Sequence, residues 1–322
     1  MRVIRISRPG GREVMEAAEL PDPTPGPGQL LVKLEAAGVN FIDVYQRTGL
    51  YSVPMPYTLG LEGAGRIEAV GPGVEGVAVG ARVAWSTSPG SYATYALVAA
   101  EKAVPVPAGI AGEAAAAAML QGMTAHYLAR ATYPLKAGDA CIVHAAAGGV
   151  GLLLIQVAKL AGARVLGTVS TPEKAQLARE AGADQVVLYT RDDFVAAAKQ
   201  WTGGSGVQVV YDSVGKDTFE RSLDCLARRG MLVLYGQSSG PVGPFDLQVL
   251  NAKGSLFVTR PTLFHYTASR EELLARAGEV FDWIAAGRLK LRIGARFPLD
   301  QAAEAHRQLE ARLTTGKVLL IP

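Results

Sequence analysis

The order of apolar and polar positions changes character twice along the chain. Over roughly the first hundred residues, short apolar runs alternate with turns rich in glycine and proline, and helical periodicity is weak. This pattern predicts an irregular, partly closed β-domain. Its predicted strands are residues 3–6, 30–34, 65–70, 82–85 and 93–98.

The middle of the chain repeats one unit, made of an apolar strand, a turn and an amphipathic helix. A helix-prone stretch from Ala114 to about Ala131 precedes the repeats, and the helix that begins after Thr171 is well marked, with Pro172 in its first turn and Gly182 just past its end. Six such strands with short crossovers predict a doubly wound parallel sheet. The predicted strands are residues 141–145, 165–169, 186–189, 207–211, 231–235 and 255–259.

The pattern changes again after Pro261. Ser269 and Glu272 have the spacing of a capping box, which predicts a helix that runs to about Ala286. A strand over residues 292–299, a second helix capped by Asp300, and an apolar strand over 317–321 follow. We expect the last strand to pair with the N-terminal domain.

Composition and charge exclude several classes of protein. With 49% hydrophobic and 19% charged residues, the chain can bury two cores, which excludes a disordered protein. The net charge of +3 is small and the basic residues are scattered, so we expect no nucleic-acid partner. The most apolar stretch, 150–158, is about half as long as a bilayer span, and the N-terminus does not resemble a secretory signal. We therefore expect a soluble, cytoplasmic protein without a membrane partner, in which Cys141 and Cys225 are buried thiols rather than a disulfide.

The sharpest chemical signal is a glycine-rich turn between a strand and a helix. The buried strand that starts at Cys141 runs into Ala146, Gly148 and Gly151, which match the pattern A-x-G-x-x-G, and an apolar helix begins at once. The pyrophosphate of a dinucleotide needs open backbone N–H groups at a helix N-terminus, approached closely without side chains. This turn, which includes Gly149 and Val150, therefore predicts a dinucleotide site. Taken alone, it would also fit an ordinary tight turn.

The residues that follow the next strand favour NADPH over NADH. A site that prefers NAD carries an acidic residue for the ribose 2′-hydroxyl about 20 residues beyond the glycines. Here Ser170 ends the strand, and Lys174, one helical turn on, can pair with a 2′-phosphate. The neighbouring Glu173 would repel a 2′-phosphate, but a carboxylate at the start of a helix is also explained by its favourable interaction with the helix dipole. Lys174 could also be an ordinary solvated charge.

The residues that would hold a metal are missing. A catalytic zinc needs cysteine, histidine and an acidic residue, and a structural zinc needs closely spaced cysteines. The four histidines are far apart in the sequence, and no cysteine occurs in the first 140 residues. We expect no metal.

Several blocks together resemble one family. Gly60–Gly65 is similar to the Gly-His-Glu-x-x-Gly motif of the medium-chain dehydrogenases/reductases, with Leu61 where the zinc-dependent members have a histidine ligand. Val39–Tyr45 resembles the stretch that carries their cysteine ligand, in the form found in the zinc-independent quinone oxidoreductases, the zeta-crystallin-like branch. Further blocks similar to that branch are His144–Gly151, Tyr211–Gly215, Gly236–Gly240, Phe257–Pro261 and the C-terminal end, Glu310–Pro322.

The resemblance implies an α/β protein with two domains and NADPH as cofactor. A GroES-like β-domain would comprise residues 1–120 and 262–322, with a doubly wound Rossmann domain over 121–261 between them. Asn40 and Thr124 would lie near the nicotinamide, Tyr189 near the adenine, and Arg312 at the 2′-phosphate; Tyr189 could instead be a core residue. The expected cofactor-binding residues are Asn40, Thr124, Gly148, Gly149, Val150, Gly151, Ser170, Lys174, Tyr189, Gly236, Phe257, Val258 and Arg312.

The substrate side is less well determined by the sequence. A quinone needs an apolar, aromatic slot and donors for its carbonyl oxygens, and Asn40, Tyr45 and Tyr51 can supply both. These donors would stabilise the developing oxyanion while hydride is transferred from the nicotinamide, so we expect them to be the catalytic residues. The tyrosines could also simply cover the domain surface.

Three interpretations of the function stay open. The first is an NADPH-dependent quinone reductase that works without a metal. The second is a reductase of activated C=C bonds in enals or enones, and the third is a non-catalytic NADPH-binding redox sensor. In each case the long apolar strand 255–259 would form an edge of the sheet, which predicts a homodimer through that edge.

Overall fold

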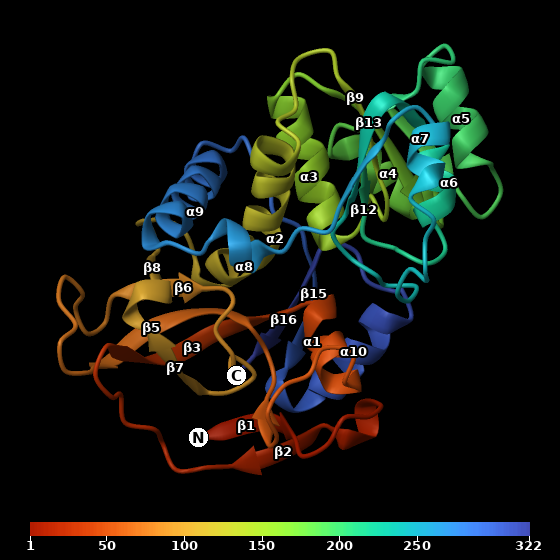
Figure 1. Ribbon diagram of the computed structural model, residues 1–322. Helices are drawn as coiled ribbons and strands as arrows, with labels where there is room; N and C mark the ends of the chain where they lie inside the picture. The colour runs from red at the N-terminus through yellow and green to blue at the C-terminus, as the bar shows by residue number, and fades with distance from the viewer. The chain divides into compact units, whose positions relative to one another are not determined.

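The computed structural model describes all residues, 1–322, and the chain folds into two compact units. The first unit comprises Met1–Met123 and Tyr266–Pro322, so both chain ends belong to it. The second unit is the continuous segment Thr124–His265. No sheet is shared between the units, and each unit has its own hydrophobic core (Figure 1).

The first unit is a β-domain with two sheets. One sheet has the strand order β15-β16-β3-β5-β6-β8, with β7 also paired to β3, and a smaller sheet has the order β2-β1-β4. The pairing among β3, β5, β6, β7 and β8 is antiparallel. The strands are β1 (Arg2–Ile6), β2 (Glu16–Glu19), β3 (Gln29–Val39), β4 (Tyr57–Thr58), β5 (Glu62–Val70), β6 (Arg82–Trp85), β7 (Tyr95–Ala99), β8 (Val104–Pro105), β15 (Ile293–Pro298) and β16 (Lys317–Ile321).

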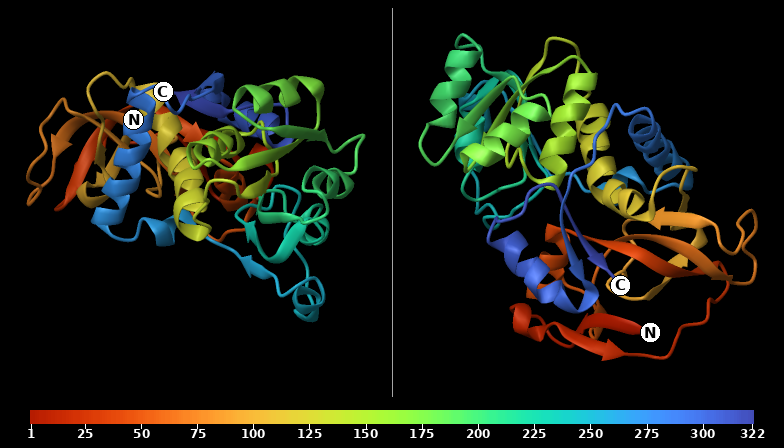
Figure 2. Two further views of the ribbon diagram at one scale, coloured as in Figure 1. Left: turned by 90° about the horizontal axis from the view of Figure 1, so that it is seen from above. Right: turned by 180° about the vertical axis from the view of Figure 1, so that it is seen from behind.

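The C-terminal strand completes the N-terminal sheet, as its apolar sequence predicted. β16 pairs antiparallel with β3, with Val318 opposite Val39 and Leu320 opposite Ala37. The blue C-terminal strands and the red-to-orange N-terminal strands accordingly lie side by side in both views of Figure 2. Lys317–Leu320 are buried because β15 and β3 flank this strand. Lys317, the first residue of β16, is therefore buried.

The helices of the first unit include one that the sequence pattern did not predict. α1 (Phe41–Thr48) follows β3 directly and ends at Gly49, whose left-handed φ of 82° suits glycine. The capping box of Ser269 and Glu272 is confirmed at α9 (Arg270–Ala285). Asp300 is not a helix cap, because a 3₁₀ turn over Leu299–Gln301 precedes α10 (Ala302–Glu310) and moves the cap to Gln301. The other helices at this unit and its borders are α2 (Gly112–Tyr127) and α8 (Leu263–Tyr266).

The second unit is the predicted doubly wound parallel sheet. Its strand order is β11-β10-β9-β12-β13-β14, and every pair is parallel. Helices cover both faces, with α3 on one face and α5, α6 and α7 on the other (Figure 1). The strands are β9 (Ala140–Val143), β10 (Arg164–Val169), β11 (Gln185–Leu188), β12 (Val207–Asp212), β13 (Leu226–Leu234) and β14 (Phe257–Thr259). The helices are α3 (Gly149–Leu160), α4 (Pro172–Glu180), α5 (Phe194–Trp201), α6 (Phe219–Leu223) and α7 (Gln248–Ala252).

Local signals in this unit are largely confirmed. The Thr171 hydroxyl caps α4 by accepting a hydrogen bond from the Lys174 backbone N–H. Cys141 and Cys225 are buried free thiols, and burial raises the pKa of both. The edge strand β14 is shorter than predicted, because Ser255 has a left-handed φ of 56° that ends the extended backbone.

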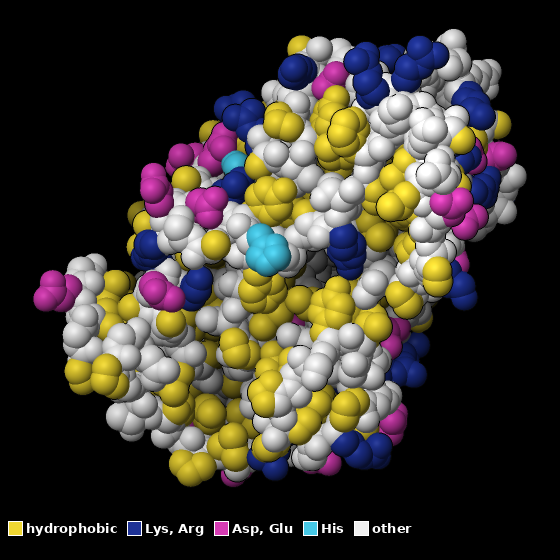
Figure 3. Space-filling view, in the orientation of Figure 1, with side chains coloured by type: hydrophobic (Ala, Val, Ile, Leu, Met, Phe, Trp, Pro, Cys, Tyr) yellow, Lys and Arg dark blue, Asp and Glu magenta, His cyan; other side chains and the backbone are white.

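Charge and hydropathy add two facts about the surface. The Lys and Arg side chains are dispersed over the face shown in Figure 3 rather than gathered in one patch. No helix is long and apolar enough to cross a membrane.

Candidate functional site

The glycine-rich turn of the second unit has the geometry of an anion cradle. β9 ends at Val143, Ala145 has a left-handed φ of 49°, and α3 begins at Gly149. Gly148 is the N-cap, and no side chain caps the helix. The first N–H groups of a helix have no intrahelical acceptor, so those at Gly149 and Val150 are open to a ligand.

Gly151 allows the helix to approach the turn closely. A Cβ atom at Gly151 would lie 2.8 Å from the Ala146 carbonyl oxygen and closer still to that of Ala145. Both are backbone atoms, which cannot move aside without distorting the turn. At Gly148 a Cβ atom would lie 3.1 Å from the Ala145 oxygen, a tight contact that a small shift can relieve. The glycine at the last position of the predicted pattern, Gly151, is therefore a steric requirement.

A buried histidine anchors the strand that leads into the turn. His144 contacts the Thr168 hydroxyl through Nδ1 at 2.8 Å and the Ser222 hydroxyl through Nε2 at 2.9 Å. Ser222 donates its proton to the Thr218 carbonyl, so Nε2 must carry the hydrogen of the neutral ring and donate to Ser222. Burial lowers the pKa of His144, which agrees with the neutral form. This network ties β9 to β10 and α6, a structural role.

The residues predicted for the 2′-phosphate and the adenine lie at the carboxyl ends of β10 and β11. Ser170 follows β10 and Lys174 lies in the first turn of α4, both partly exposed. Hydrogen bonds from its own backbone N–H and from Thr171 lower the pKa of Glu173, as expected for a carboxylate at a helix start. Tyr189 follows β11 and is 39% exposed, so its alternative interpretation as a core residue is wrong.

The remaining cofactor candidates are spread over other elements. Thr124 is buried in α2, and Gly236 lies beyond β13, where a Cβ atom would lie 2.6 Å from the Ser213 carbonyl oxygen. Phe257 and Val258, on the edge strand β14, are exposed. Arg312, in the first unit, is an exposed residue just after α10 with a left-handed φ of 58°. These positions stay predictions as cofactor contacts.

In the first unit, Asn40 is the centre of a buried polar cluster. It is the N-cap of α1, and the Asp43 side chain, three residues on, accepts a hydrogen bond from the Asn40 backbone N–H. Its Nδ2 donates to Oε2 of Glu62 at 2.9 Å, and its Oδ1 accepts from Lys317 Nζ at 3.0 Å and from Gln121 Nε2 at 3.2 Å. Asn40 is 5% exposed. The cluster joins β3, β5, β16 and α2.

An ion pair between Lys317 and Glu62 closes this cluster. Lys317 is 2% exposed and Glu62 is fully buried, and the Lys317 ammonium contacts Oε2 of Glu62 directly. The other carboxylate oxygen, Oε1, accepts the Leu120 backbone N–H at 2.6 Å. The pair crosses over Gly38, where a Cβ atom would lie 2.6 Å from Nζ of Lys317. Glycine at this position leaves the space that the two charged groups occupy.

A second buried chain of hydrogen bonds begins beside Asn40. Asp43 Oδ2 accepts from the Asn40 backbone N–H at 2.8 Å and from the Tyr92 hydroxyl at 3.0 Å. The Tyr92 oxygen lies 3.0 Å from His306 Nε2, and His306 Nδ1 lies 3.4 Å from Arg47. Because Tyr92 gives its only proton to Asp43, Nε2 of His306 donates to Tyr92 and Nδ1 accepts from Arg47.

Burial determines the charge states along this chain. Burial raises the pKa of Asp43 from 3.8 to about 7, opposed by hydrogen bonds from Asn40 and Tyr92 and by the charge of Lys317. Burial and the neighbouring Arg47 lower the pKa of His306 to about 3, so the ring is neutral. The chain ends at Glu310, which accepts two hydrogen bonds from Arg47 at 2.7 and 3.1 Å and is one-third exposed.

The candidate substrate tyrosines form an aromatic group on and beside α1. Tyr45 is 9% exposed, and its ring lies 5.2 Å from that of Tyr51 and 6.1 Å from that of Phe41. The Tyr51 backbone N–H also donates to the Tyr45 carbonyl at 3.0 Å. Tyr45 is thus largely buried rather than a surface cover, while Tyr51 and Phe41 are partly exposed.

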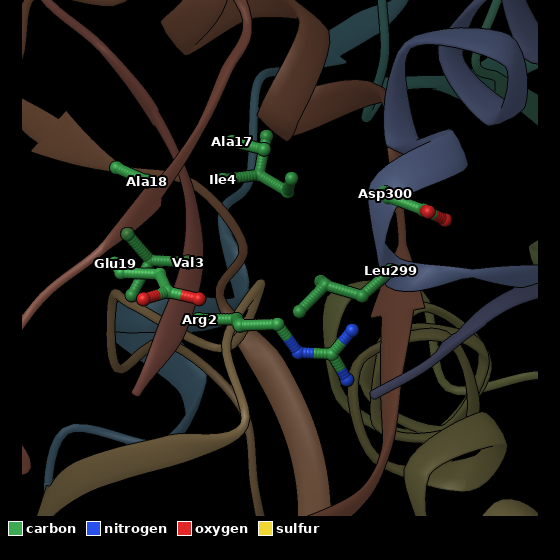
Figure 4. Close-up of a pocket in the computed structure, with 8 residues that line it drawn as sticks. All are labelled: Arg2, Val3, Ile4, Ala17, Ala18, Glu19, Leu299 and Asp300. Carbon is green, nitrogen blue, oxygen red and sulfur yellow. The ribbon is translucent and has the colours of Figure 1, made fainter.

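A small pocket elsewhere in the first unit contains none of the candidate residues. Its volume is about 170 Å³, and apolar side chains such as Ile4 and Leu299 line it together with charged ones at its rim (Figure 4). It lies beside β1, β2 and the turn before α10, and its lining residues are Arg2, Val3, Ile4, Ala17, Ala18, Glu19, Leu299 and Asp300.

The donor set of the polar cluster does not fit a metal ion. Leu61, which stands at the position of the histidine ligand of zinc-dependent relatives, has no ligating atom. An ammonium group, from Lys317, already contacts Glu62. No three His, Cys, Asp or Glu side chains lie together as a metal-ligand group.

The sequence pattern identified Asn40 but not three of its partners. Glu62 lies inside the Gly60–Gly65 motif, in which Leu61 is the position that distinguishes the zinc-independent branch. The sequence could have singled out Lys317, because it is a charged residue at the start of an otherwise apolar strand. It gave no indication that Gln121 is buried, since a polar residue in a helix normally faces solvent.

Comparisons with known proteins agree with this architecture. Residues 26–108 match the alcohol dehydrogenase GroES-like domain, and residues 149–276 match the zinc-binding dehydrogenase family. Quinone oxidoreductases of Pseudomonas aeruginosa and Escherichia coli are 49% and 47% identical to this chain, over 99% of it and of each relative.

Solved structures are similar over the same length. The crystal structure of Escherichia coli quinone oxidoreductase complexed with NADPH matches with a TM-score of 0.98 and 47% identity, and covers all of both chains. A 2-haloacrylate reductase matches with a TM-score of 0.87 and 41% identity, over all of this chain and 99% of that one. From its fold, its motifs and these full-length matches, the chain belongs to the quinone oxidoreductase family of the medium-chain dehydrogenases/reductases.

Proposed function

We propose that this protein is an NADPH-dependent quinone reductase that works without a metal ion. The observation that carries the proposal is the match, with a TM-score of 0.98 and 47% identity, to a quinone oxidoreductase complexed with NADPH. The glycine-rich turn supports the cofactor, because its open N–H groups suit a pyrophosphate. Bound NADPH would supply the hydride, and the protein would bind and orient the two reactants.

The residues of the second unit would hold the cofactor by its phosphates. Gly148, Gly149, Val150 and Gly151 offer backbone N–H groups and close approach at the start of α3. Lys174 would add a positive charge for the 2′-phosphate.

The other proposed cofactor contacts lie on several elements. Ser170 and the exposed Tyr189 lie beyond the ends of β10 and β11, in places suited to the adenosine end. Arg312, on the first unit, would add a second charge for the 2′-phosphate. Asn40, Thr124, Gly236, Phe257 and Val258 complete the proposed set.

The catalytic role would fall to the polar and aromatic residues of the first unit. Tyr45 and Tyr51, with Phe41, offer aromatic surface for a flat acceptor. Asn40 offers an amide N–H toward an acceptor oxygen on which negative charge develops during hydride transfer. Their contribution would be positioning and electrostatic stabilisation rather than covalent chemistry.

A second candidate function has an observation of its own. The 2-haloacrylate reductase of a Burkholderia species is 42% identical over 98% of both chains. A haloacrylate carries an electron-poor C=C bond, so the same hydride donor and fold would serve such an acceptor.

The direct test measures oxidation of NADPH with a small 1,4-quinone and with 2-chloroacrylate, each against a control without acceptor. Turnover of the quinone supports the proposal, and turnover of the chloroacrylate alone would move the protein to the C=C reductases. Binding of NADPH without turnover of either acceptor would favour the redox-sensor interpretation.

We also propose a homodimer through the edge of the second unit's sheet. β14 has one neighbour, β13, and exposes Phe257 and Val258, by 56% and 38%. Pairing with the same strand of a second copy would cover this apolar edge. Sedimentation of the wild type and of Val258→Lys tests it, since a monomeric wild type would refute the proposal. The cytoplasmic location stays a prediction.

A further inference from the structure

The buried cluster around Asn40 fixes the orientation of two side-chain amides. An ammonium group has only hydrogens to give, so the atom of Asn40 that faces Lys317 must be the oxygen. Nδ2 of Asn40 then faces Glu62, whose carboxylate can only accept. Gln121 must in turn present its Nε2 to the Asn40 oxygen. The charges of one ion pair therefore set the direction of every hydrogen bond in the cluster.

In this orientation two polar groups, one N–H of Asn40 and Oε1 of Gln121, lack a good hydrogen bond. The second N–H of Asn40 has only a 3.4 Å contact with the Gly38 carbonyl, beyond the range of a good hydrogen bond. Oε1 of Gln121 is buried and has no hydrogen-bond partner at all. A buried acceptor without a donor is costly, so Oε1 of Gln121 needs a donor hydrogen that none of the described side chains supplies. Gln121 itself is 91% buried, since 9% of its surface is exposed.

We propose that Asn40 and Gln121 form a donor–acceptor pair for a ligand group that carries an acceptor oxygen with a donor hydrogen beside it, and that the Lys317–Glu62 ion pair sets the polarity of this pair. The inference rests on the proposed function for the identity of the ligand. Two parts of the reactants have this chemistry. One is the carboxamide of NADPH, and the other is a quinone oxygen that becomes a hydroxyl on reduction.

Gln121 is then a binding residue, and Lys317 and Glu62 are positioning residues. The Asn40 oxygen is occupied by two donors, from Lys317 and Gln121, so it has no lone pair to offer a ligand. Asn40 can therefore act toward the ligand only as a donor, and Gln121 only as an acceptor. Gly38 is required for the same arrangement, because a side chain at this position would occupy the space of the Lys317–Glu62 ion pair.

The first experiment compares removal of one charge of the Lys317–Glu62 ion pair with removal of both. Glu62→Gln or Lys317→Met alone leaves a buried charge without its partner, which is strongly destabilising, whereas the double variant removes both charges together. We expect each single variant to melt well below the wild type and the double variant to melt near it. The matched control is Asp224→Asn with Lys253→Met, which removes an ion pair from the surface of the second unit.

The orientation of the Asn40 amide can be measured by NMR, without an activity assay. The chain has only two asparagines, Asn40 and the exposed Asn251, so protein labelled with ¹⁵N-asparagine gives two side-chain amide signals. In the wild type we expect the two Asn40 protons to differ widely in chemical shift, since one is bound to a carboxylate. The double variant should lose this difference while Asn251 stays unchanged. An Asn40 signal that is the same in both proteins would overturn the proposed role of the ion pair.

The binding role is tested with Gln121→Met, which keeps the length of the side chain and removes both polar atoms. We expect a loss of about tenfold, the effect of one good hydrogen bond, either in the Kd of NADPH measured by fluorescence or in the KM of the quinone. A weaker Kd assigns the pair to the carboxamide, and a raised KM alone assigns it to the quinone oxygen. Wild-type values of both would overturn the proposal.

These outcomes can be separated from failure of the proposed function. If the wild type reduced no quinone at all, the proposed function would fail, but the amide signal of Asn40 and the Kd of NADPH would still decide the present inference. If instead the double variant did not fold, the Gln121→Met binding measurements would decide it, because that variant leaves the ion pair in place.

Discussion

Replacing Asp43 by asparagine changes how the stability of the first unit depends on pH. Asp43 is fully buried, and two donors, the Asn40 backbone N–H and the Tyr92 hydroxyl, contact its Oδ2. The charged groups that act on it are Lys317 and Glu62, with opposite signs. Asparagine keeps an oxygen for both donors and cannot ionise. The variant therefore isolates the contribution of one buried charge.

The magnitude follows from the difference in pKa between the folded and unfolded states. Burial raises the pKa of Asp43 from 3.8 to about 7, so the folded state holds its proton more tightly than the unfolded state. The stability that this proton provides is fully present below the unfolded value and is lost as pH rises through the folded value. A tenfold change in an acid dissociation constant corresponds to about 1.4 kcal/mol, so the loss amounts to about 4 kcal/mol in total.

The expected result is a difference between variant and wild type that grows with pH. Between about pH 5 and about pH 8, the free energy of unfolding of Asp43→Asn should rise by about 3 kcal/mol relative to the wild type. A constant cost accompanies it, because the new NH₂ group replaces Oδ1, which is buried without a hydrogen-bond partner. That cost is about 1–3 kcal/mol and does not change with pH.

Urea unfolding at several pH values and constant ionic strength measures the difference. The signal should report on the first unit, because the two units can unfold in separate transitions. Glu68→Gln, on an exposed position of β5, is the control for the removal of one carboxylate. If the curves of Asp43→Asn and wild type ran parallel from pH 5 to pH 8, Asp43 would already be ionised when folded, and the reasoning from burial would be refuted.

Three further predictions concern the two units separately. Gly151→Ala should weaken NADPH binding at least about tenfold in a fluorescence titration, because the added Cβ atom enters the backbone of the turn; unchanged binding would contradict this. Gly38→Ala should lower the free energy of unfolding by about 1–3 kcal/mol in urea, because the methyl group overpacks the buried ion pair; an unchanged value would mean that the pair moves aside freely. Lys174→Met and Arg312→Met should each raise the Kd of NADPH about tenfold or more and leave that of NADH unchanged, and equal effects on both cofactors would contradict the phosphate assignment.

Much of the fold could be predicted from local patterns. In the second unit, each strand is a short apolar run between turn residues, and the helices carry recognisable caps such as Thr171. The parallel, doubly wound type of the sheet therefore followed from the repeat of the βα unit, whereas the strand order comes from the structure. The C-terminal strand was equally clear from its apolar run. α1 was missed because Phe41–Thr48 places Asp43 and Arg47 in the interior, whereas pattern reasoning assigns charged residues to the surface.

The site could be predicted only in part, for the same physical reason. Asn40 and the glycine-rich turn have sequence motifs, so they were found. The partners of Asn40 lie far away along the chain, with Lys317 separated from it by 277 residues, and their buried charges are stable only as a set. The local periodicity of the sequence cannot indicate such a group of buried, mutually compensating charges. The group is recognised only from the pairing of β16 with β3.

The measurement that tests the proposed function most directly is steady-state oxidation of NADPH and NADH, side by side, with a small 1,4-quinone as acceptor. We predict quinone-dependent turnover with a clear preference for NADPH in kcat/KM, and no loss of activity on treatment with a metal chelator. A preference for NADH, or the absence of quinone-dependent turnover, would contradict the proposed function.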